Sequence, residues 1–274
     1  MRKIKFAGFF IVILIASVYL IQAQSLPIPE GRRLRDIVED KYPDGKLLVG
    51  ATTGSWGFNE PIGEIMDREF SYVTPENDFK QSVVRNNPDD WNWSRADAWL
   101  QHIIENNQVL RIHGPISPQC SKWAKEDNRT AKELSYELDT FMTALCKRYN
   151  RVEGIKYLDV VNEVALSDGS WHHPKPGTDE WENPWLIIGQ DDDPNRTPLY
   201  VKQAFAIADE HAPELKLIFN NHCHPGTAGM GKVKETVLYL REQGYRVDGL
   251  GWQAHVEVGW ATEGNLLELR KVID

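Results

Sequence analysis

Cysteines are scarce in this sequence, with only Cys120, Cys146 and Cys223 among 274 residues. They are widely spaced and form no C-x-x-C motif, which argues against a zinc ribbon or a thioredoxin-type redox site. At most one disulfide can form, and the sequence does not select its pair. A chain of this length can instead bury a large hydrophobic core.

Positive charge is also in short supply: 31 Lys and Arg stand against 40 Asp and Glu, a formal charge of −9. No Lys/Arg-rich stripe compensates locally, so we expect neither a nucleic-acid partner nor an anionic membrane surface. A Gly-rich phosphate loop is missing as well, because "GATTGSWG" does not match G-x-G-x-x-G. Without internal repeats or low-complexity linkers, residues 25–274 are predicted to form one domain.

The first residues have the pattern of a secretory signal. Arg2, Lys3 and Lys5 precede an apolar run over residues 6–21, and the polar "QAQS" follows. An uncleaved membrane anchor is the alternative, but the run is somewhat short for a span of about 20 residues. We therefore expect residues 1–24 to be a cleaved leader and the mature protein to be secreted, periplasmic or extracellular, without stable membrane association.

Past the leader, short apolar segments alternate with segments of helical periodicity. Thr130 and Glu133 form a predicted capping box before the clearest helix. The predicted strands cover residues 46–52, 70–77, 109–114, 155–164, 215–222 and 249–256, and the predicted helices cover 97–107, 134–145, 199–212, 232–244 and 264–274. This alternation predicts a parallel sheet with helices outside it.

Two architectures fit that alternation, a doubly wound open sheet and a (β/α)8 TIM barrel. Polar groups follow the predicted strands as "PEND", "HG", "NE", "NNHCH" and "QAH", each at the carboxyl end of its strand. A barrel brings those ends together on one face, where its active sites lie. We therefore predict an α/β barrel, with about six β/α units in this chain.

The stretch "DVVNEV" places Asn162 and Glu163 at the end of the fourth predicted strand. Glycoside hydrolysis needs a carboxylic acid to protonate the leaving oxygen and a second carboxylate on the other side of the sugar. An adjacent Asn can donate to the sugar 2-hydroxyl. Strict strand alternation would point the two side chains to opposite faces, so we expect a twist or bulge at this strand end.

Four motifs together resemble glycoside hydrolase family 10, the xylanase family. They are "YVTPENDFKQ", "RIHG", "YLDVVNEV" and "GLGWQAH", and they occur in the family's order and spacing. The resemblance implies a (β/α)8 fold and retaining hydrolysis of β-1,4-linked xylan or a related hemicellulose, with a polysaccharide as partner. It implies no cofactor and no metal, and we expect a monomer when the protein is complete.

The resemblance also assigns roles to individual residues. It implies Glu163 as the acid/base, with Asn162 beside it. The other implied positions bind the sugar on the non-reducing side of the cleaved bond (Glu76, Asn77, Lys80 and His113) or lie beside the nucleophile (Gln253 and His255).

The chain departs from the family's pattern at three places. After the third-strand His the family has a Trp-His pair, and "HGPISPQCSKW" has neither residue there, although Trp123 follows at a distance. "FNNHCHPG" stands where the family has an N-D-Y-N type stretch. The family's nucleophilic glutamate ends a seventh strand, which would follow residue 274, so we expect the sequence to be partial and the nucleophile to be missing from it.

Other interpretations remain open from the sequence. His222 and His224 form an H-x-H pair, which on a strand would present both imidazoles on one face and, with His255 and Glu163, suggest a metal-dependent barrel hydrolase. A sugar-binding remnant without catalysis is a further possibility. Lys80 alone is typical of a surface lysine.

Overall fold

The computed structural model describes residues 27–273. The predicted leader, residues 1–24, lies outside this range. Among the described helices, none has the length and apolar character needed to cross a membrane.

Six parallel strands form a single sheet whose spatial order, β1-β2-β3-β4-β5-β6, follows the sequence. Their bounds are β1 (Gly50–Thr53), β2 (Tyr72–Pro75), β3 (Val109–Ile112), β4 (Ile155–Asn162), β5 (Lys216–Asn221) and β6 (Gly249–Trp252). A doubly wound sheet would reverse its strand order at a switch point. The sequential order excludes that alternative and fits a barrel wall.

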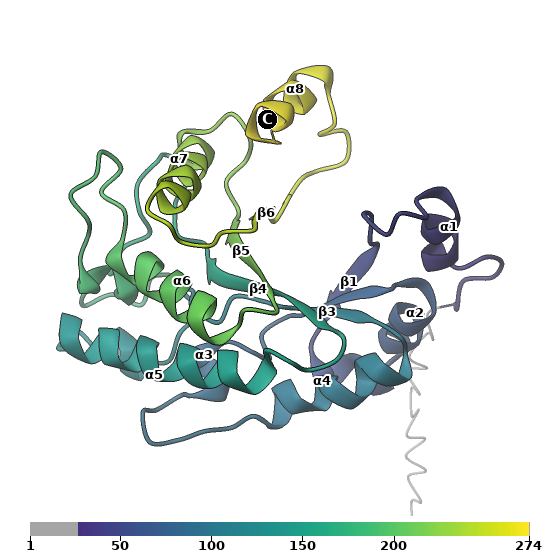
Figure 1. Ribbon diagram of the computed structural model, residues 1–274, viewed down its shortest axis with the longest axis horizontal. Helices are drawn as coiled ribbons and strands as arrows, with labels where there is room; N and C mark the ends of the chain where they lie inside the picture. The colour runs from purple at the N-terminus through teal and green to yellow at the C-terminus, as the bar shows by residue number, and fades with distance from the viewer. Residues whose placement is uncertain (1–26, 274) are drawn as a thin grey trace, which may run out of the picture.

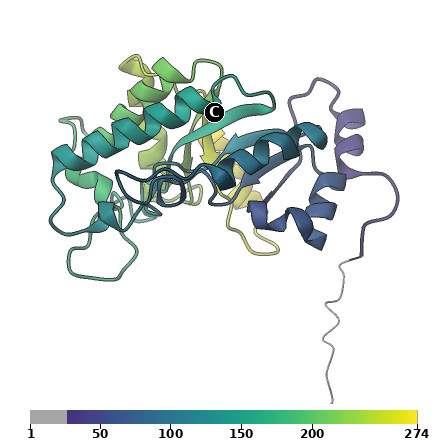
Figure 2. The same cartoon turned by 90° about the horizontal axis from the view of Figure 1, so that it is seen from below.

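The strands alternate with helices, as the sequence predicts. The α-helices are α1 (Leu34–Lys41), α2 (Pro61–Glu69), α3 (Gln81–Val84), α4 (Ser94–Glu105), α5 (Ala131–Tyr149), α6 (Leu199–His211), α7 (Ala228–Glu242) and α8 (Glu263–Ile273), and the 3-10 helices are η1 (Ser55–Asn59), η2 (Trp123–Lys125) and η3 (Pro184–Ile188). Helices α2 and α4 to α7 cover the convex side of the curved sheet (Figures 1 and 2). The six predicted β/α units are therefore confirmed.

The longest helix, α5, begins at the capping box that the sequence predicts. Thr130 accepts a hydrogen bond from the Glu133 amide, and the Glu133 carboxylate accepts one from the Thr130 amide at 2.8 Å. These two bonds satisfy amide groups that would otherwise have no partner at the helix start. The apolar positions Leu134, Leu138 and Phe141 are fully buried against the sheet side of α5, so local capping and core packing specify the same helix.

Three features correct or complete the predicted elements. The first strand begins at Gly50 rather than residue 46, and β5 ends at Asn221, before His222. The long loop over residues 169–198 contains η3, which buries Trp185 completely. All three cysteines are free and buried, so the possible disulfide is absent from the structure.

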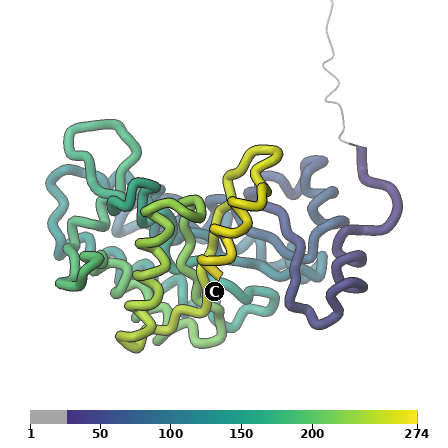
Figure 3. Tube along the Cα trace, turned by 90° about the horizontal axis from the view of Figure 1, so that it is seen from above, coloured from purple at the N-terminus to yellow at the C-terminus, as the bar shows by residue number. Residues whose placement is uncertain are grey.

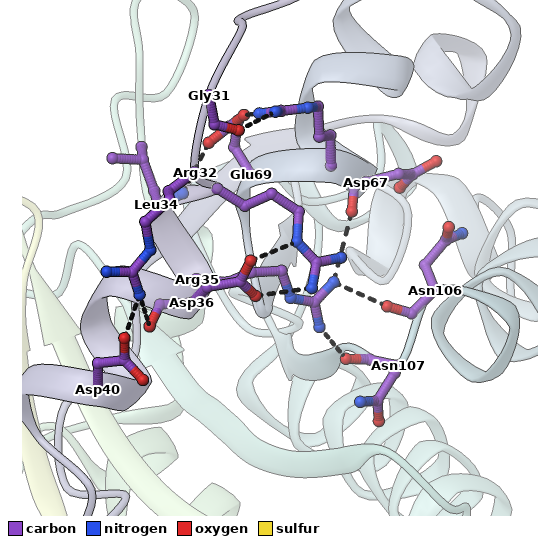
Figure 4. A network of polar contacts seen from close by, with 12 residues as sticks. Gly31, Arg32, Leu34, Arg35, Asp36, Asp40, Asp67, Glu69, Asn106 and Asn107 are labelled. Atoms are coloured by element: carbon purple, nitrogen blue, oxygen red, sulfur yellow. Dashed lines mark hydrogen bonds and ion pairs between the residues drawn. The ribbon is translucent and has the colours of Figure 1, made fainter.

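The N-terminal helix α1 is bonded to the C-terminal ends of α2 and α4 (Figure 4). Arg35 donates to the carbonyl oxygens of Asn106, at 2.9 Å, and of Asn107, at the end of α4. The Leu34 amide donates to the carboxylate of Glu69 in α2 at 2.7 Å. These contacts hold α1 beside the edge of the sheet formed by β1.

The described strands do not close on themselves. Within residues 27–273, β1 and β6 each pair with one neighbour only, and they form the two edges of the curved sheet. Helices α1 and α8 lie apart from each other at these opposite edges (Figures 1 and 3). The shape is that of a half-barrel, and the carboxyl ends of the strands lie along one rim of it.

Candidate active site

Glu163 lies immediately after β4, where the strand path turns. Its φ is +56°, in the left-handed region that L-residues rarely adopt. Because of this turn, the side chains of Glu163 and Asn162 bind the same residue. Gln253 Nε2 donates to Asn162 Oδ1 at 2.9 Å and to Glu163 Oε1 at 3.0 Å. The twist that we expected at the strand end is therefore present, and it brings the paired amide and carboxylate to one side.

Asn162 is almost fully buried and held from two strands. Besides Gln253 on the β6 side, Asn220 of β5 donates from Nδ2 to Asn162 Oδ1 at 2.8 Å. The Nδ2 group of Asn162 has no hydrogen-bond partner among the described residues. Unpartnered buried donors are rare in proteins. This amide is therefore oriented through its oxygen, while its buried Nδ2 group is left without a partner.

Gly114 permits the close approach of β3 to this amide. Its φ is +52°, and a Cβ atom added there would lie 3.1 Å from Asn162 Cβ. Any larger residue would strain the backbone and crowd the amide. The "HG" that ends the third predicted strand thus contributes a histidine to the site and a glycine that makes space for its neighbour.

A buried carboxylate orients His113. Asp159 of β4 is fully buried and accepts from His113 Nδ1 at 2.8 Å and from Arg111 Nε at 2.7 Å. Arg111 continues the network to Asn220 Oδ1 at 3.2 Å. Burial lowers the pKa of Arg111, but the Asp159 carboxylate and Tyr72 together outweigh that effect, and the pKa lies above its ordinary value.

Lys80 is buried in the segment that follows β2 and is influenced by the charges of two carboxylates. It is 4% exposed, follows Asn77 by one turn, and its amide donates to the Asn77 carbonyl at 3.0 Å. Burial lowers the pKa of Lys80, while the nearby charges of Glu163 and Glu76 act in the opposite direction. Glu76 itself is exposed at the rim. The surface-lysine interpretation is therefore wrong: this ammonium group lies within the site.

His255 completes the arrangement on the β6 side. Its Nε2 is 2.7 Å from Gln253 Oε1, so Gln253 connects His255 to both Asn162 and Glu163. Hydrogen bonds thus link His113 to His255 through Asp159, Arg111, Asn220, Asn162 and Gln253. The predicted residues His113, Asn162, Glu163, Gln253 and His255 therefore belong to one bonded group at the carboxyl ends of the strands.

The histidine pair His222 and His224 does not form the strand-borne metal site considered above. Strand β5 ends at Asn221, so alternation along a strand does not apply to the pair. His224 instead packs its ring near Trp252 and Trp260, at centroid distances of 6.1 and 6.5 Å. No group of three or more His, Cys, Asp or Glu among residues 27–273 is arranged to hold a metal ion.

The segment after His113, "HGPISPQCSKW", which has no Trp-His pair, contacts a tryptophan from another loop. Ser117 is fully buried there, and its carbonyl accepts from Trp185 Nε1 at 3.1 Å. A tryptophan from the long loop after β4 therefore packs against this segment. Trp123, further along, lies under Arg129, whose guanidinium carbon is 4.4 Å from the ring centroid.

Sequence reasoning missed the residues that hold the site in place. Asp159 and Arg111 are charged residues within apolar strands, and this is the sequence signal that marks them. Gly251 of β6 gave no such signal, and a Cβ added to it would lie 2.5 Å from both Arg111 Nη2 and Asn220 Oδ1. His172 was also missed: its Nδ1 lies 3.3 Å from the Glu163 carbonyl, and burial lowers its pKa.

Comparisons with known proteins agree on one family. The model of the family described as Glycosyl hydrolase family 10 matches residues 37–273. Endo-beta-1,4-xylanase Xyn10C from Cellvibrio japonicus is 23% identical over 269 residues, covering 96% of this chain and 43% of its own length. Endo-1,4-beta-xylanase A from Caldicellulosiruptor saccharolyticus is 30% identical over 239 residues, covering 82% of this chain and 62% of its own length.

A solved structure shows the same architecture. The crystal structure of CbXyn10B in native form superposes with a TM-score of 0.68 at 25% identity, covering 86% of this chain and 67% of that one. The chain thus spans about half the length of the curated relatives it matches.

Proposed function

This chain belongs to glycosyl hydrolase family 10, and from that premise we propose that the protein hydrolyses β-1,4-linked xylan or a related hemicellulose with retention of anomeric configuration. The observation that carries the proposal is the Gln253 amide, which binds both Asn162 Oδ1 and Glu163 Oε1. This contact fixes an amide and a carboxylate side by side at the carboxyl ends of the strands, where barrel enzymes place their chemistry.

In this proposal Glu163 is the acid/base. It protonates the glycosidic oxygen as the bond to the leaving sugar breaks, and its carboxylate then takes a proton from the water that completes hydrolysis. Asn162 contributes its free Nδ2 donor to the 2-hydroxyl of the sugar, a contact that strengthens in the oxocarbenium-like transition state. The oxygen of the same amide is already held by Asn220 and Gln253, so little ordering is needed when substrate binds.

The residues that follow β2 and β3 hold the sugar on the non-reducing side. Lys80 is buried and near Glu163, so its ammonium group can donate to sugar hydroxyls close to the reacting carbon. Glu76 and Asn77 extend this surface toward the rim. His113 is oriented by Asp159 through Nδ1, which leaves Nε2 for the ligand.

We place the second carboxylate on a strand that follows α8. Strands pair in sequence order throughout the sheet, so the next strand would pair with the free edge of β6. Its carboxyl end would then lie beside Gln253 and His255. A retaining mechanism requires the two carboxyl groups about 5–5.5 Å apart, so a nucleophile at that carboxyl end would have to come within this distance of Glu163.

The stereochemical outcome tests the mechanism. The full-length protein, incubated with xylo-oligosaccharides and followed by NMR, should release the β-anomer first, before mutarotation. An α-anomer as the first product would refute retention. Absence of hydrolysis, combined with measurable oligosaccharide binding, would favour the second candidate, a sugar-binding protein without catalysis.

That second candidate has one observation in its favour. Of the two carboxylates near Lys80, Glu76 is exposed at the rim and belongs to the proposed sugar-binding motif. That leaves Glu163 alone of these two for a mechanism that needs two carboxylates.

We also propose that the mature protein is exported and monomeric. Detection of the protein outside the cytoplasm, and its mass in solution, test these two statements.

A further inference from the structure

Trp56 is an exposed tryptophan beside the proposed sugar site that none of the roles above uses. It lies in η1, directly after β1, on the same rim as the carboxyl ends of the other strands. Its exposed fraction is 60%, although tryptophan is a residue that proteins usually bury for the most part. The position and the exposure together suggest contact with a ligand.

The loop that carries Trp56 is bonded directly to the "PEND" segment. The Glu76 amide donates to the Thr53 carbonyl at 3.0 Å, and the Ser55 amide donates to Asp78 Oδ2 at 2.7 Å. Asp78 is fully buried and also accepts from Trp99 Nε1 at 2.8 Å. Trp56 and the sugar-binding motif are therefore parts of one bonded unit.

The indole ring is also fixed in orientation. A Cβ atom added to Gly54 would lie 2.5 Å from both Cδ1 and Nε1 of Trp56, so one edge of the ring rests on the glycine backbone. Only glycine leaves space for this contact. The ring is thus held by an edge while much of its surface faces solvent.

Other exposed tryptophans of the described chain are covered by neighbouring groups. Trp91 stacks on Trp93 at a centroid distance of 5.3 Å, and Lys125 Nζ lies 5.2 Å from the ring of Trp181. No aromatic ring or cation within residues 27–273 stacks on Trp56. The ring of Trp56 therefore has no aromatic or cationic neighbour on its faces, whereas the rings of Trp91 and Trp181 each have one.

We propose that Trp56 is a stacking platform for a xylosyl residue on the non-reducing side of the cleaved bond, beyond the sugars that Glu76, Asn77 and Lys80 hold. This inference rests on the proposed function and extends its substrate site. The faces of a β-xylopyranose ring are apolar, because its hydroxyls are equatorial and its axial C–H bonds point toward the faces. Packing that face on the indole removes apolar surface from water while the hydroxyls remain solvated.

The test measures binding of short and long oligosaccharides by calorimetry. All proteins are full-length and carry Glu163→Gln, so that the ligands stay intact. Trp56→Ala should weaken xylohexaose binding roughly 3- to 30-fold and leave xylobiose binding unchanged. Trp56→Phe should retain most of the xylohexaose affinity. The matched control is Tyr136→Ala, which removes an exposed aromatic from α5 and should change neither affinity.

The outcomes separate this inference from the function on which it rests. Unchanged xylohexaose binding in Trp56→Ala refutes the platform. Equal weakening of both ligands also refutes it, because that result indicates that the loop merely supports Glu76 and Asn77. If the protein with Trp56 intact binds neither xylobiose nor xylohexaose, the proposed function fails, and the platform fails with it.

Discussion

The buried carboxylate of Asp159 offers a sharp test of how the site is held. Asp159 is fully buried and binds three donor groups, Arg111 Nε at 2.7 Å, Arg111 Nη2 at 2.5 Å and His113 Nδ1 at 2.8 Å. In Asp159→Ala the guanidinium group, whose side chain is only 23% exposed, loses its counter-charge. Removing one partner of a buried ion pair costs about 3–5 kcal/mol, because the other charge stays desolvated.

Urea denaturation of the full-length protein measures this change in the free energy of unfolding. The matched control is Asp209→Asn, which removes a carboxylate from the more exposed pair between Asp209 and Arg246. An exposed pair contributes about 0–1 kcal/mol. Asp159→Asn should fall between the two variants, because an amide oxygen can still accept a hydrogen bond. A loss in Asp159→Ala no larger than in the control would refute the buried-network interpretation.

Three further predictions concern the site itself. Glu163→Gln in the full-length protein should lower turnover of xylan about 10²–10⁴-fold and slow glycosylation by activated aryl glycosides much less; equal losses would argue against an acid role. Gly114→Ala should cost more unfolding free energy than Gly177→Ala: both residues have positive φ, for which about 1–2 kcal/mol is typical, but only Gly114 would also crowd Asn162. Burial lowers the pKa of Lys80, so the affinity for oligosaccharides should be highest below that pKa and should fall as the pH rises through it. This fall should occur at a lower pH than for an ordinary lysine. A calorimetric pH series in which the affinity stays constant into the ordinary lysine range would contradict this.

The sequence alone predicted the order and type of the elements well. Strands and helices alternate where apolar runs and helical periodicity indicate, and α5 begins at the capping box of Thr130 and Glu133. These features depend on neighbouring residues, so local physics is sufficient to determine them. The rule that parallel strand ends share a face also predicts that Glu163, Gln253 and His113 lie together.

Element boundaries were harder to predict, because they depend on pairing across the sheet. The stretch "LKLIFNNH" reads as one strand, yet β5 pairs with β6 only as far as Asn221. His222 and His224 therefore lie in the following loop, and the argument that they share a strand face does not hold.

The internal geometry of the site was decided by tertiary structure. The left-handed φ of Glu163 turns its carboxylate to the side of Asn162, and both side chains then share the amide of Gln253, about 90 positions along the chain. Strand alternation, a local rule, predicted opposite faces for this pair. The sequence determined which groups reach the rim, because periodicity and strand order are local. Contacts between β3, β4, β5 and β6 determined which way the groups point, since a buried amide or carboxylate adopts the orientation that satisfies its partners.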